Sequence, residues 1–139
     1  MKTTFRIAFA CAVLVMTAAC GKDYHRKQVE QYVLEAQQVT PTQVDPATVL
    51  ASVEIEGDDV VYRYVIDENL ITIEAFSQQD ELLRNEFNDR RTRDSDMGKF
   101  VKAVSDAHMR IVMVYQGNVT HDTFTISFPL EELAVTQPQ

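Results

Sequence analysis

The stretch VLASVEIEGDDVVYRYVID, residues 49–67, decides the fold that the sequence predicts. Gly57 and Asp58 divide it into two runs of alternating polarity, and a glycine that leads a two-residue loop suits a type II′ turn. A hairpin closed by that turn has one apolar face, formed by the pairs Ile55–Val60, Val53–Tyr62, Ala51–Tyr64 and Val49–Ile66. Shifting the register by one residue would turn Glu54 and Arg63 toward the core, so the register is well specified.

A helix is predicted before this hairpin, over residues 22–38. Its apolar residues recur at i, i+3, i+4 and i+7, which places them on one helix face: Val29, Tyr32, Val33 and Ala36. Thr40 and Pro41 end the helix, because the residue before a proline is pushed out of the helical region. Residues 40–46, which contain two prolines, are expected to form a loop.

Helices also follow the hairpin. Residues 69–74 contain β-forming side chains and are expected to form a third short strand. Ser77 suits an N-cap for a helix over residues 78–90. A polar break over residues 90–96 separates it from a second helix over residues 97–107. That second helix carries a complete apolar stripe: Met97, Phe100, Val101, Val104 and His108.

A second hairpin is predicted near the end of the chain. Its first strand alternates through Met109, Ile111, Met113 and Tyr115, and its second strand through Phe124, Ile126 and Phe128. Val112 and Val114 make the other face of the first strand apolar too, which is typical of a central or doubly covered strand. Gly117 and Asn118 begin the turn, and residues 134–139 are expected to form a flexible tail.

The predicted element order is α-ββ-(β)-αα-ββ. Strands separated by a run of helices indicate the α+β class. We expect an antiparallel sheet made of two β-hairpins, with the helices packed on one face. About 120 residues follow the N-terminal segment described next, which is enough for one domain with its own core.

The first residues have the pattern of an export signal. Lys2 and Arg6 precede an apolar run over residues 7–16, which is too short to span a bilayer as a helix. Small residues and then Cys20 follow this run, an order typical of a secretory signal peptide and its cleavage site. Ordinary cleavage after Ala19 would leave one unpaired thiol in an oxidising compartment, which is unfavourable.

The segment Thr17-Ala18-Ala19-Cys20 resembles the lipobox of bacterial lipoproteins, although leucine is more usual where Thr17 stands. The resemblance implies that Cys20 is the lipid attachment site and the first residue after cleavage. Because Gly21 rather than aspartate follows, it also implies an outer-membrane anchor facing the periplasm. The expected organisation is a signal peptide over residues 1–19, an anchor, helix and loop over residues 20–48, and the α+β domain over residues 49–133, continuous with that helix.

Charge narrows the range of partners. The chain has 13 basic and 21 acidic side chains, and removal of residues 1–19 takes away Lys2 and Arg6. The remaining 11 basic and 21 acidic residues give a net charge of −10. Such a chain lacks the basic footprint that nucleic acid needs, and a second, electrostatic contact with anionic lipid is not expected. A basic protein partner is compatible with this charge.

No catalytic or metal-binding pattern stands out, so no enzyme, cofactor or metal is expected. His25, His108 and His121 lack the spacing that places two imidazoles on one metal ion. His108 falls on the apolar stripe, where a core position is favoured over a ligand role. Arg90, Arg91 and Arg93 form a basic spot, which is expected to interact with the C-terminus of the preceding helix.

Four acidic residues form what we call the acidic tip of the first hairpin: Glu54, Glu56, Asp58 and Asp59. Their spacing does not fit a calcium loop of the EF-hand type. A contact for a basic partner and a merely solvated turn both remain open. We expect Glu54 and Arg63 to form a diagonal surface ion pair, worth under about 1 kcal/mol.

The element order on a lipid-anchored chain is similar to that of small bacterial lipoproteins of the pilotin-like type. The points of resemblance are Cys20, the strand at residues 60–64 and the final hairpin that ends in Phe128. This resemblance implies a non-enzymatic binding or assembly role at the envelope, through a peptide or helix bound between sheet and helices. The alternative is an inhibitor or immunity protein against a cationic periplasmic toxin or lysozyme, whose encounter the acidic charge would steer. A small hydrolase is the third class.

Overall fold

The computed structural model describes the backbone of residues 2–134 and the side chains of residues 21–134. It contains these elements: α1 (Lys2–Val39), β1 (Thr42–Asp45), β2 (Thr48–Glu56), β3 (Asp59–Ile66), α2 (Ile73–Ser77), α3 (Asp80–Arg93), α4 (Ser95–Asp106), β4 (Arg110–Gly117), β5 (Thr123–Phe128) and α5 (Leu130–Leu133). The expected tail lies, apart from Ala134, outside the described residues. Within the described part of the chain, no helix has both the length and the hydropathy needed to cross a membrane.

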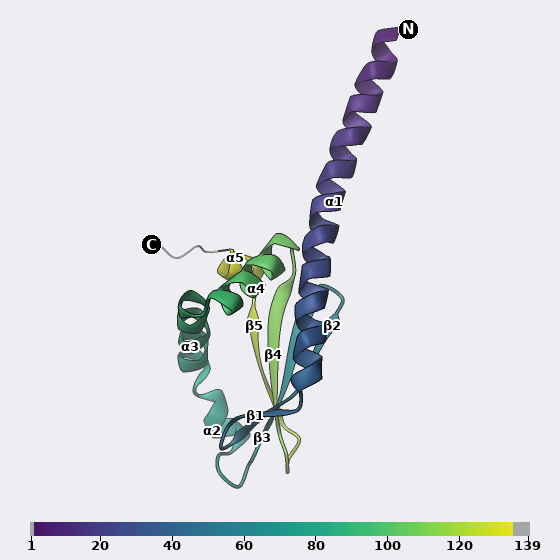
Figure 1. Ribbon diagram of the computed structural model, residues 1–139. Helices are drawn as coiled ribbons and strands as arrows, with labels where there is room; N and C mark the ends of the chain where they lie inside the picture. Colours follow the sequence, from purple (N-terminus) through teal and green to yellow (C-terminus); the bar gives the residue numbers. More distant parts are fainter. Residues whose placement is uncertain (1, 135–139) are drawn as a thin grey trace.

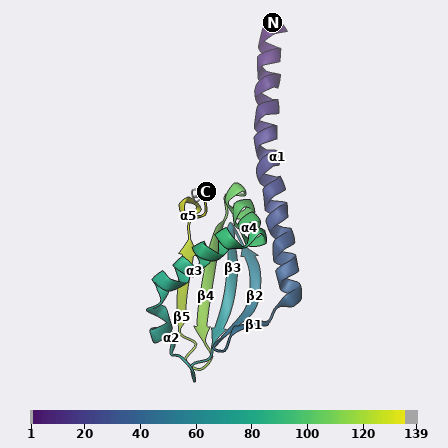
Figure 2. The ribbon, with the colours of Figure 1, turned by 60° about the vertical axis from the view of Figure 1, so that its left-hand side comes forward.

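The five strands form one sheet in the order β1-β2-β3-β4-β5, and the helices lie on one face of it (Figures 1 and 2). The predicted α+β class is confirmed. The sheet is mixed rather than fully antiparallel, because β3 and β4 pair in parallel. A parallel pair needs a long crossover connection, and α2, α3 and α4 provide it.

The first hairpin has the predicted register near its turn and a different one farther away. Ile55 pairs with Val60 and Val53 with Tyr62, as predicted, and Gly57 has the positive φ of 62° that a leading turn glycine can adopt. A bulge between Leu50 and Ser52 then shifts the pairing, so that Leu50 lies opposite Tyr64 and Thr48 opposite Ile66. The predicted pairs of Ala51 and Val49 are therefore wrong, since a bulge adds one unpaired residue to the strand.

Two short segments differ from the prediction. Residues 42–45 form edge strand β1, paired antiparallel with β2, where a loop was expected. Residues 69–74 form no strand; the chain turns there, and Thr72 caps α2 by accepting a hydrogen bond from the Ala75 amide. Ser77 is the last residue of α2 rather than an N-cap, because α3 begins only at Asp80.

The break between α3 and α4 is a single residue instead of the predicted segment 90–96. The Asp94 side chain accepts hydrogen bonds from the amides of Asp96 and Met97, so it caps α4 directly after α3 ends. The two helices approach closely at Gly98, where an added Cβ would lie 2.9 Å from the carbonyl oxygen of Arg91. A residue without a side chain is therefore required at this crossing.

The core lies between the sheet and the helices. The predicted stripe of α1 is confirmed, with Val29 and Val33 buried and Tyr32 and Ala36 packed against the core. In α4, Val101 and Val104 are buried, but His108 is exposed with a φ of 56°. Its expected core position is wrong because α4 ends at Asp106, before the stripe reaches it.

The second hairpin is confirmed. Met113 pairs with Ile126 and Ile111 with Phe128, and the chain turns after Gly117. Strand β4 lies between β3 and β5, the central position that its two apolar faces predicted. The two hairpins together thus supply four of the five strands, and their parallel junction joins them into one sheet.

Candidate functional site

The acidic tip is largely ion-paired within the chain. Asp59 receives two hydrogen bonds from Arg110, at 2.8 and 2.9 Å. Asp58 lies 3.1 Å from Arg26, whose guanidinium also donates to the carbonyl oxygen of Gly57 at 2.8 Å. Three elements, α1, β3 and β4, therefore meet at this turn.

The other two acids of the tip differ from each other. Glu56 forms an ion pair with Arg63 at 2.6 Å, so the predicted pair of Arg63 with Glu54 is wrong. Glu54, opposite Val61, is the nearer acid in the hairpin register, but the Arg63 guanidinium extends along the strands to Glu56. Among the described residues, Glu54 has no ion-pair partner and is exposed. Three of the four acidic side chains of the tip are thus already paired with arginines.

Cys20 lies in the helical backbone of α1, and its side chain is outside the described residues. The backbone continues from it into the packed part of α1 without a break (Figure 1). Its lipid attachment therefore stays a prediction from the sequence. An anchor at Cys20 would be joined to the domain through α1.

A row of stacked aromatic rings covers the helix-facing side of β3 and β4. Tyr62 stacks with Tyr64 at a centroid distance of 6.5 Å, and Tyr64 stacks with Tyr115 at 4.7 Å. Phe100 of α4 joins the row at Tyr62, and Tyr32 of α1 packs against Phe100 at 5.4 Å. We call Tyr62, Tyr64 and Tyr115 the tyrosine floor.

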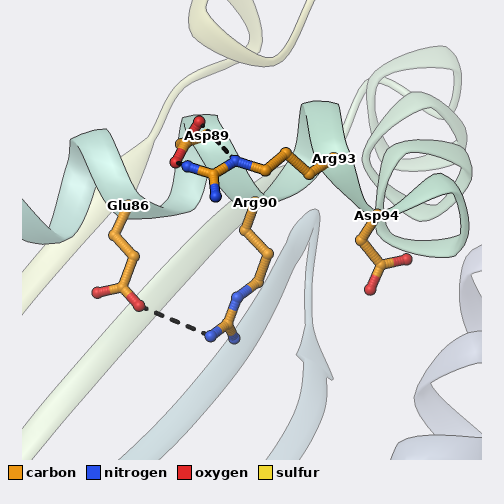
Figure 3. Close-up of a pocket in the computed structure, with 5 residues that line it drawn as sticks. All are labelled: Glu86, Asp89, Arg90, Arg93 and Asp94. Carbon is orange, nitrogen blue, oxygen red and sulfur yellow. Dashed lines mark hydrogen bonds and ion pairs between the residues drawn. The ribbon is translucent and has the colours of Figure 1, made fainter.

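Helix α3 borders an open cavity of about 490 Å³ (Figure 3). The residues that line it are all charged: Glu86, Asp89, Arg90, Arg93 and Asp94. Glu86 and Arg90 form an ion pair at 3.6 Å and point from α3 toward the strands, whereas Arg93 pairs with Asp89 along the helix. The tyrosines do not line this cavity, but Arg90 and Glu86 are close enough to act on Tyr64 and Tyr115 through their charges. We call the cavity, together with the neighbouring tyrosine floor, the α3 groove.

The pKa shifts connect the two parts of the α3 groove. Burial raises the pKa of Tyr64 to about 12, and the nearby Arg90 charge opposes that rise. Burial also raises the pKa of Tyr115, and the neighbouring Tyr64 and then the Glu86 charge add to the rise. The pKa of Tyr62 is raised by burial and then by its neighbour Tyr64. These charged side chains therefore act on the floor, and the phenols stay protonated at neutral pH.

The hydroxyls of the floor differ in their partners, since that of the buried Tyr115 already donates to the sulfur of Met113 at 3.6 Å. Within the described residues, Tyr62 and Tyr64 form no hydrogen bond through their side chains, and no buried side-chain oxygen is left without a partner. Their hydroxyls therefore keep some contact with solvent, although burial of the two side chains raises the pKa of both. Half-buried tyrosines with solvated hydroxyls are typical of binding surfaces, because they offer apolar area and a polar handle together.

The arrangement suits binding. It offers aromatic surface, phenolic donors, and both signs of charge along α3. Among the described residues, no group of three or more histidine, cysteine, aspartate or glutamate side chains could hold a metal ion. His108 and His121 are exposed, and His25 accepts or donates only toward Gln28, at 3.1 Å.

The basic spot predicted at residues 90–93 does lie in the last turn of α3. Cations there interact favourably with the carbonyl end of a helix. Arg91 also donates to the carbonyl oxygens of Glu132 and Leu133, which ties α3 to α5. Arg91 therefore stabilises the contact between α3 and α5, whereas Arg90 and Arg93 line the cavity of the α3 groove.

The α3 groove itself was not predicted from the sequence. Its floor comes from two hairpins and its rim from a helix between them, so no contiguous motif marks it. One signal was present: the alternation that places Tyr62, Tyr64 and Tyr115 on the inner face. Tyr62 and Tyr64 were expected on the core face, and both pack partly buried against the core, while Tyr115 is buried within it.

Three solved structures share this fold. The protein PA3611 from Pseudomonas aeruginosa matches with a TM-score of 0.62 at 13% identity, over 81% of this chain and 96% of that one. The type 2 secretion pilotin EpsS from Vibrio vulnificus matches with a TM-score of 0.62 at 7% identity, over 87% and 99%. The type II secretion pilotin AspS from Vibrio cholerae matches with a TM-score of 0.56 at 8% identity, over 82% and 96%.

No protein-family model matches the chain, and no curated protein matches it in sequence. At 7–13% identity the structural likeness establishes the fold and nothing finer. The chain thus shares its fold with two type II secretion pilotins and with PA3611.

Proposed function

We propose that this chain is a non-enzymatic lipoprotein of the bacterial envelope with a pilot-like role in assembly. The observation that carries the proposal is the shared fold with two type II secretion pilotins, over nearly the whole length of each. The signal-like N-terminus and Cys20 support the same reading, because a protein that guides a partner to a membrane needs its own anchor. Two or three acyl chains on Cys20 would hold it stably.

The binding site proposed for the partner is the α3 groove. Its floor supplies stacked aromatic rings, and Glu86 and Arg90 line the charged cavity beside them. A peptide segment with apolar side chains toward the tyrosines and charged side chains toward α3 would complement it. The acidic tip is a weaker candidate, because Asp58, Asp59 and Glu56 already pair with arginines.

Secretion in the native bacterium tests the proposal. Deleting the gene is expected to lower the export of type II substrates, and the full chain is expected to restore it. Cys20→Ala should be made in normal amounts but fail to restore export, since the domain would lack its anchor. Unchanged export in the deletion strain would contradict the assembly role. Intact-mass measurement of the extracted protein checks the acyl chains separately.

A further inference from the structure

The packing of α1 fixes which end of the domain would face the membrane. Arg26 of α1 contacts Gly57 and Asp58 at the turn between β2 and β3. Eleven residues later in the sequence, Gln37 donates to the carbonyl oxygen of Val53 at 3.0 Å. Val53 lies in β2, four residues before Gly57. These two contacts set the direction of α1, which runs away from the hairpin turn as the chain proceeds.

The turn between α4 and β4 lies at the same end. The Arg110 amide donates to the carbonyl oxygen of Asp58 at 2.9 Å, and its guanidinium pairs with Asp59. We call residues 56–59 and 107–110 together the proximal end of the domain. Six residues of continuous helix separate Cys20 from Arg26, a rise of about 9 Å.

The opposite end is equally well defined. Strands β3 and β4 run in parallel from Asp59 and Arg110 to Ile66 and Gly117. Eight residues of strand span about 25 Å. The loop of residues 118–122 therefore lies far from the proximal end, where the Glu68 carboxylate holds it through the Val119 and Thr120 amides at 2.7 Å.

We infer that the domain stands on its membrane in one orientation, with the proximal end against the lipid headgroups and the loop of residues 118–122 pointing away. This inference rests on the proposed lipid attachment at Cys20. The short helical link leaves little room for the domain to tumble, because α1 is locked to the hairpin turn. Tyr24, 60% exposed beside the anchor, suits the headgroup layer, where tyrosine is enriched.

The charges of the proximal end are compatible with this contact. Asp58, Asp59 and Glu56 would be repelled by anionic lipid if they were free, but each pairs with an arginine. The link from Cys20 through α1, rather than the net charge of the domain, then sets its orientation on the membrane. The orientation should accordingly be the same on zwitterionic and anionic vesicles.

Energy transfer to a headgroup-labelled lipid tests the orientation. The full chain is expressed with its signal, so that any single cysteine added to the domain is its only free thiol once Cys20 is acylated. Glu54→Cys places a donor dye near the proximal end at an exposed residue with no ion pair among the described residues. Val119→Cys is the matched site at the opposite end, and its side chain is 65% exposed.

On phosphatidylcholine vesicles, transfer from position 54 is expected to be several-fold higher than from position 119. The same ratio is expected when phosphatidylglycerol is included. A control chain carries a flexible Gly-Ser insertion of about twelve residues between Gly21 and Lys22, which should bring the ratio close to one.

The outcomes separate the two proposals. If the labelled chain floats with vesicles but transfers equally from both positions, the orientation is wrong and the anchor stands. A ratio that reverses, or that appears only on anionic vesicles, also overturns the orientation set by the tether. If the chain fails to float at all and has the mass of an unacylated protein, the lipid anchor is wrong, and the orientation that depends on it is overturned with it.

Discussion

Tyr64 and Tyr115 stack with their ring centroids 4.7 Å apart, across the only parallel pair of strands in the described sheet. The two residues are 51 positions apart in the sequence, and each comes from a different hairpin. Their contact therefore helps to join the two hairpins and also forms the centre of the groove that we propose for a partner. Tyr64→Phe keeps the stacked ring and removes only the hydroxyl, so the two groups can be tested separately at this position.

Truncation of Tyr64 is expected to destabilise the domain. Tyr64→Ala removes a half-buried ring and should lower the free energy of unfolding by about 2–3 kcal/mol. Tyr64→Phe keeps the ring and should change it by less than about 0.5 kcal/mol. Urea denaturation of the chain from Gly21 onward measures both. Equal losses for the two variants would show that the hydroxyl, rather than the stacked ring, stabilises the fold.

The raised pKa values of the tyrosine floor predict alkaline destabilisation. Tyr64 has a folded pKa of about 12 against an ordinary value of 10.0, and the pKa values of Tyr62 and Tyr115 are raised too. Between pH 10 and 12 the unfolded chain releases these protons while the folded chain keeps them. The free energy of unfolding should then fall by about 1.4 kcal/mol per pH unit for each tyrosine, and it should be unaffected by them below pH 10.

Phenolate absorbance provides the measurement. The native chain should show a fraction of its tyrosines titrating later than in urea, and Tyr64→Phe should remove part of that late fraction. A native titration curve that overlays the curve in urea would mean that the floor is as hydrated as free tyrosine.

The lowered pKa of Glu68 predicts a loss of stability at acid pH. Its carboxylate accepts hydrogen bonds from the Thr120 amide and hydroxyl and from the Val119 amide, and these bonds lower its pKa below the ordinary 4.5. The contribution to stability is present above pH 4.5 and is lost as the pH falls through the lower folded pKa. Amide NMR shifts of Val119 and Thr120 should follow that transition. Glu68→Gln should abolish it, and a midpoint at or above 4.5 would contradict this arrangement.

Gly98→Ala is expected to destabilise despite the better helix propensity of alanine. Propensity alone would favour alanine by up to about 1 kcal/mol. The added Cβ would lie 2.9 Å from the backbone carbonyl of Arg91, and backbone cannot move aside as a flexible side chain can. A net loss of about 1–2 kcal/mol in urea denaturation is expected. A more stable variant would show that α3 and α4 can separate without cost.

The sequence predicted what depends on local periodicity. The alternation around Gly57 defines a hairpin and its register over the residues nearest the turn, and the stripe through Val29 and Val33 defines the packed part of α1. The bulge at Ala51 was not predicted. Apolar residues of β2 face inward there with or without the bulge, so the alternation of side chains does not reveal it. The strand predicted over residues 69–74 is wrong for a different reason. Leu70 and Ile71 have β-forming side chains, but they lie in a turn.

Features set by distant contacts could not be predicted. Whether β4 pairs with β3 in parallel depends on how the three crossover helices pack, which no short pattern encodes. The tyrosine floor depends on that pairing, because it brings Tyr115 beside Tyr64. The acidic tip was recognised as a cluster, but its partners Arg26 and Arg110 come from elements far away in the sequence. Its contact with a basic partner stays a prediction.

Site-specific photo-crosslinking in the native bacterium tests the central proposal most directly. A benzoylphenylalanine at position 64 replaces one aromatic side chain with another and reaches from the floor of the α3 groove, and position 54 on the outer face of the sheet is the matched control. We expect an adduct with a component of the type II secretion apparatus at position 64 and none at position 54. No adduct at position 64, or the same adduct from both positions, would contradict a partner bound in the groove.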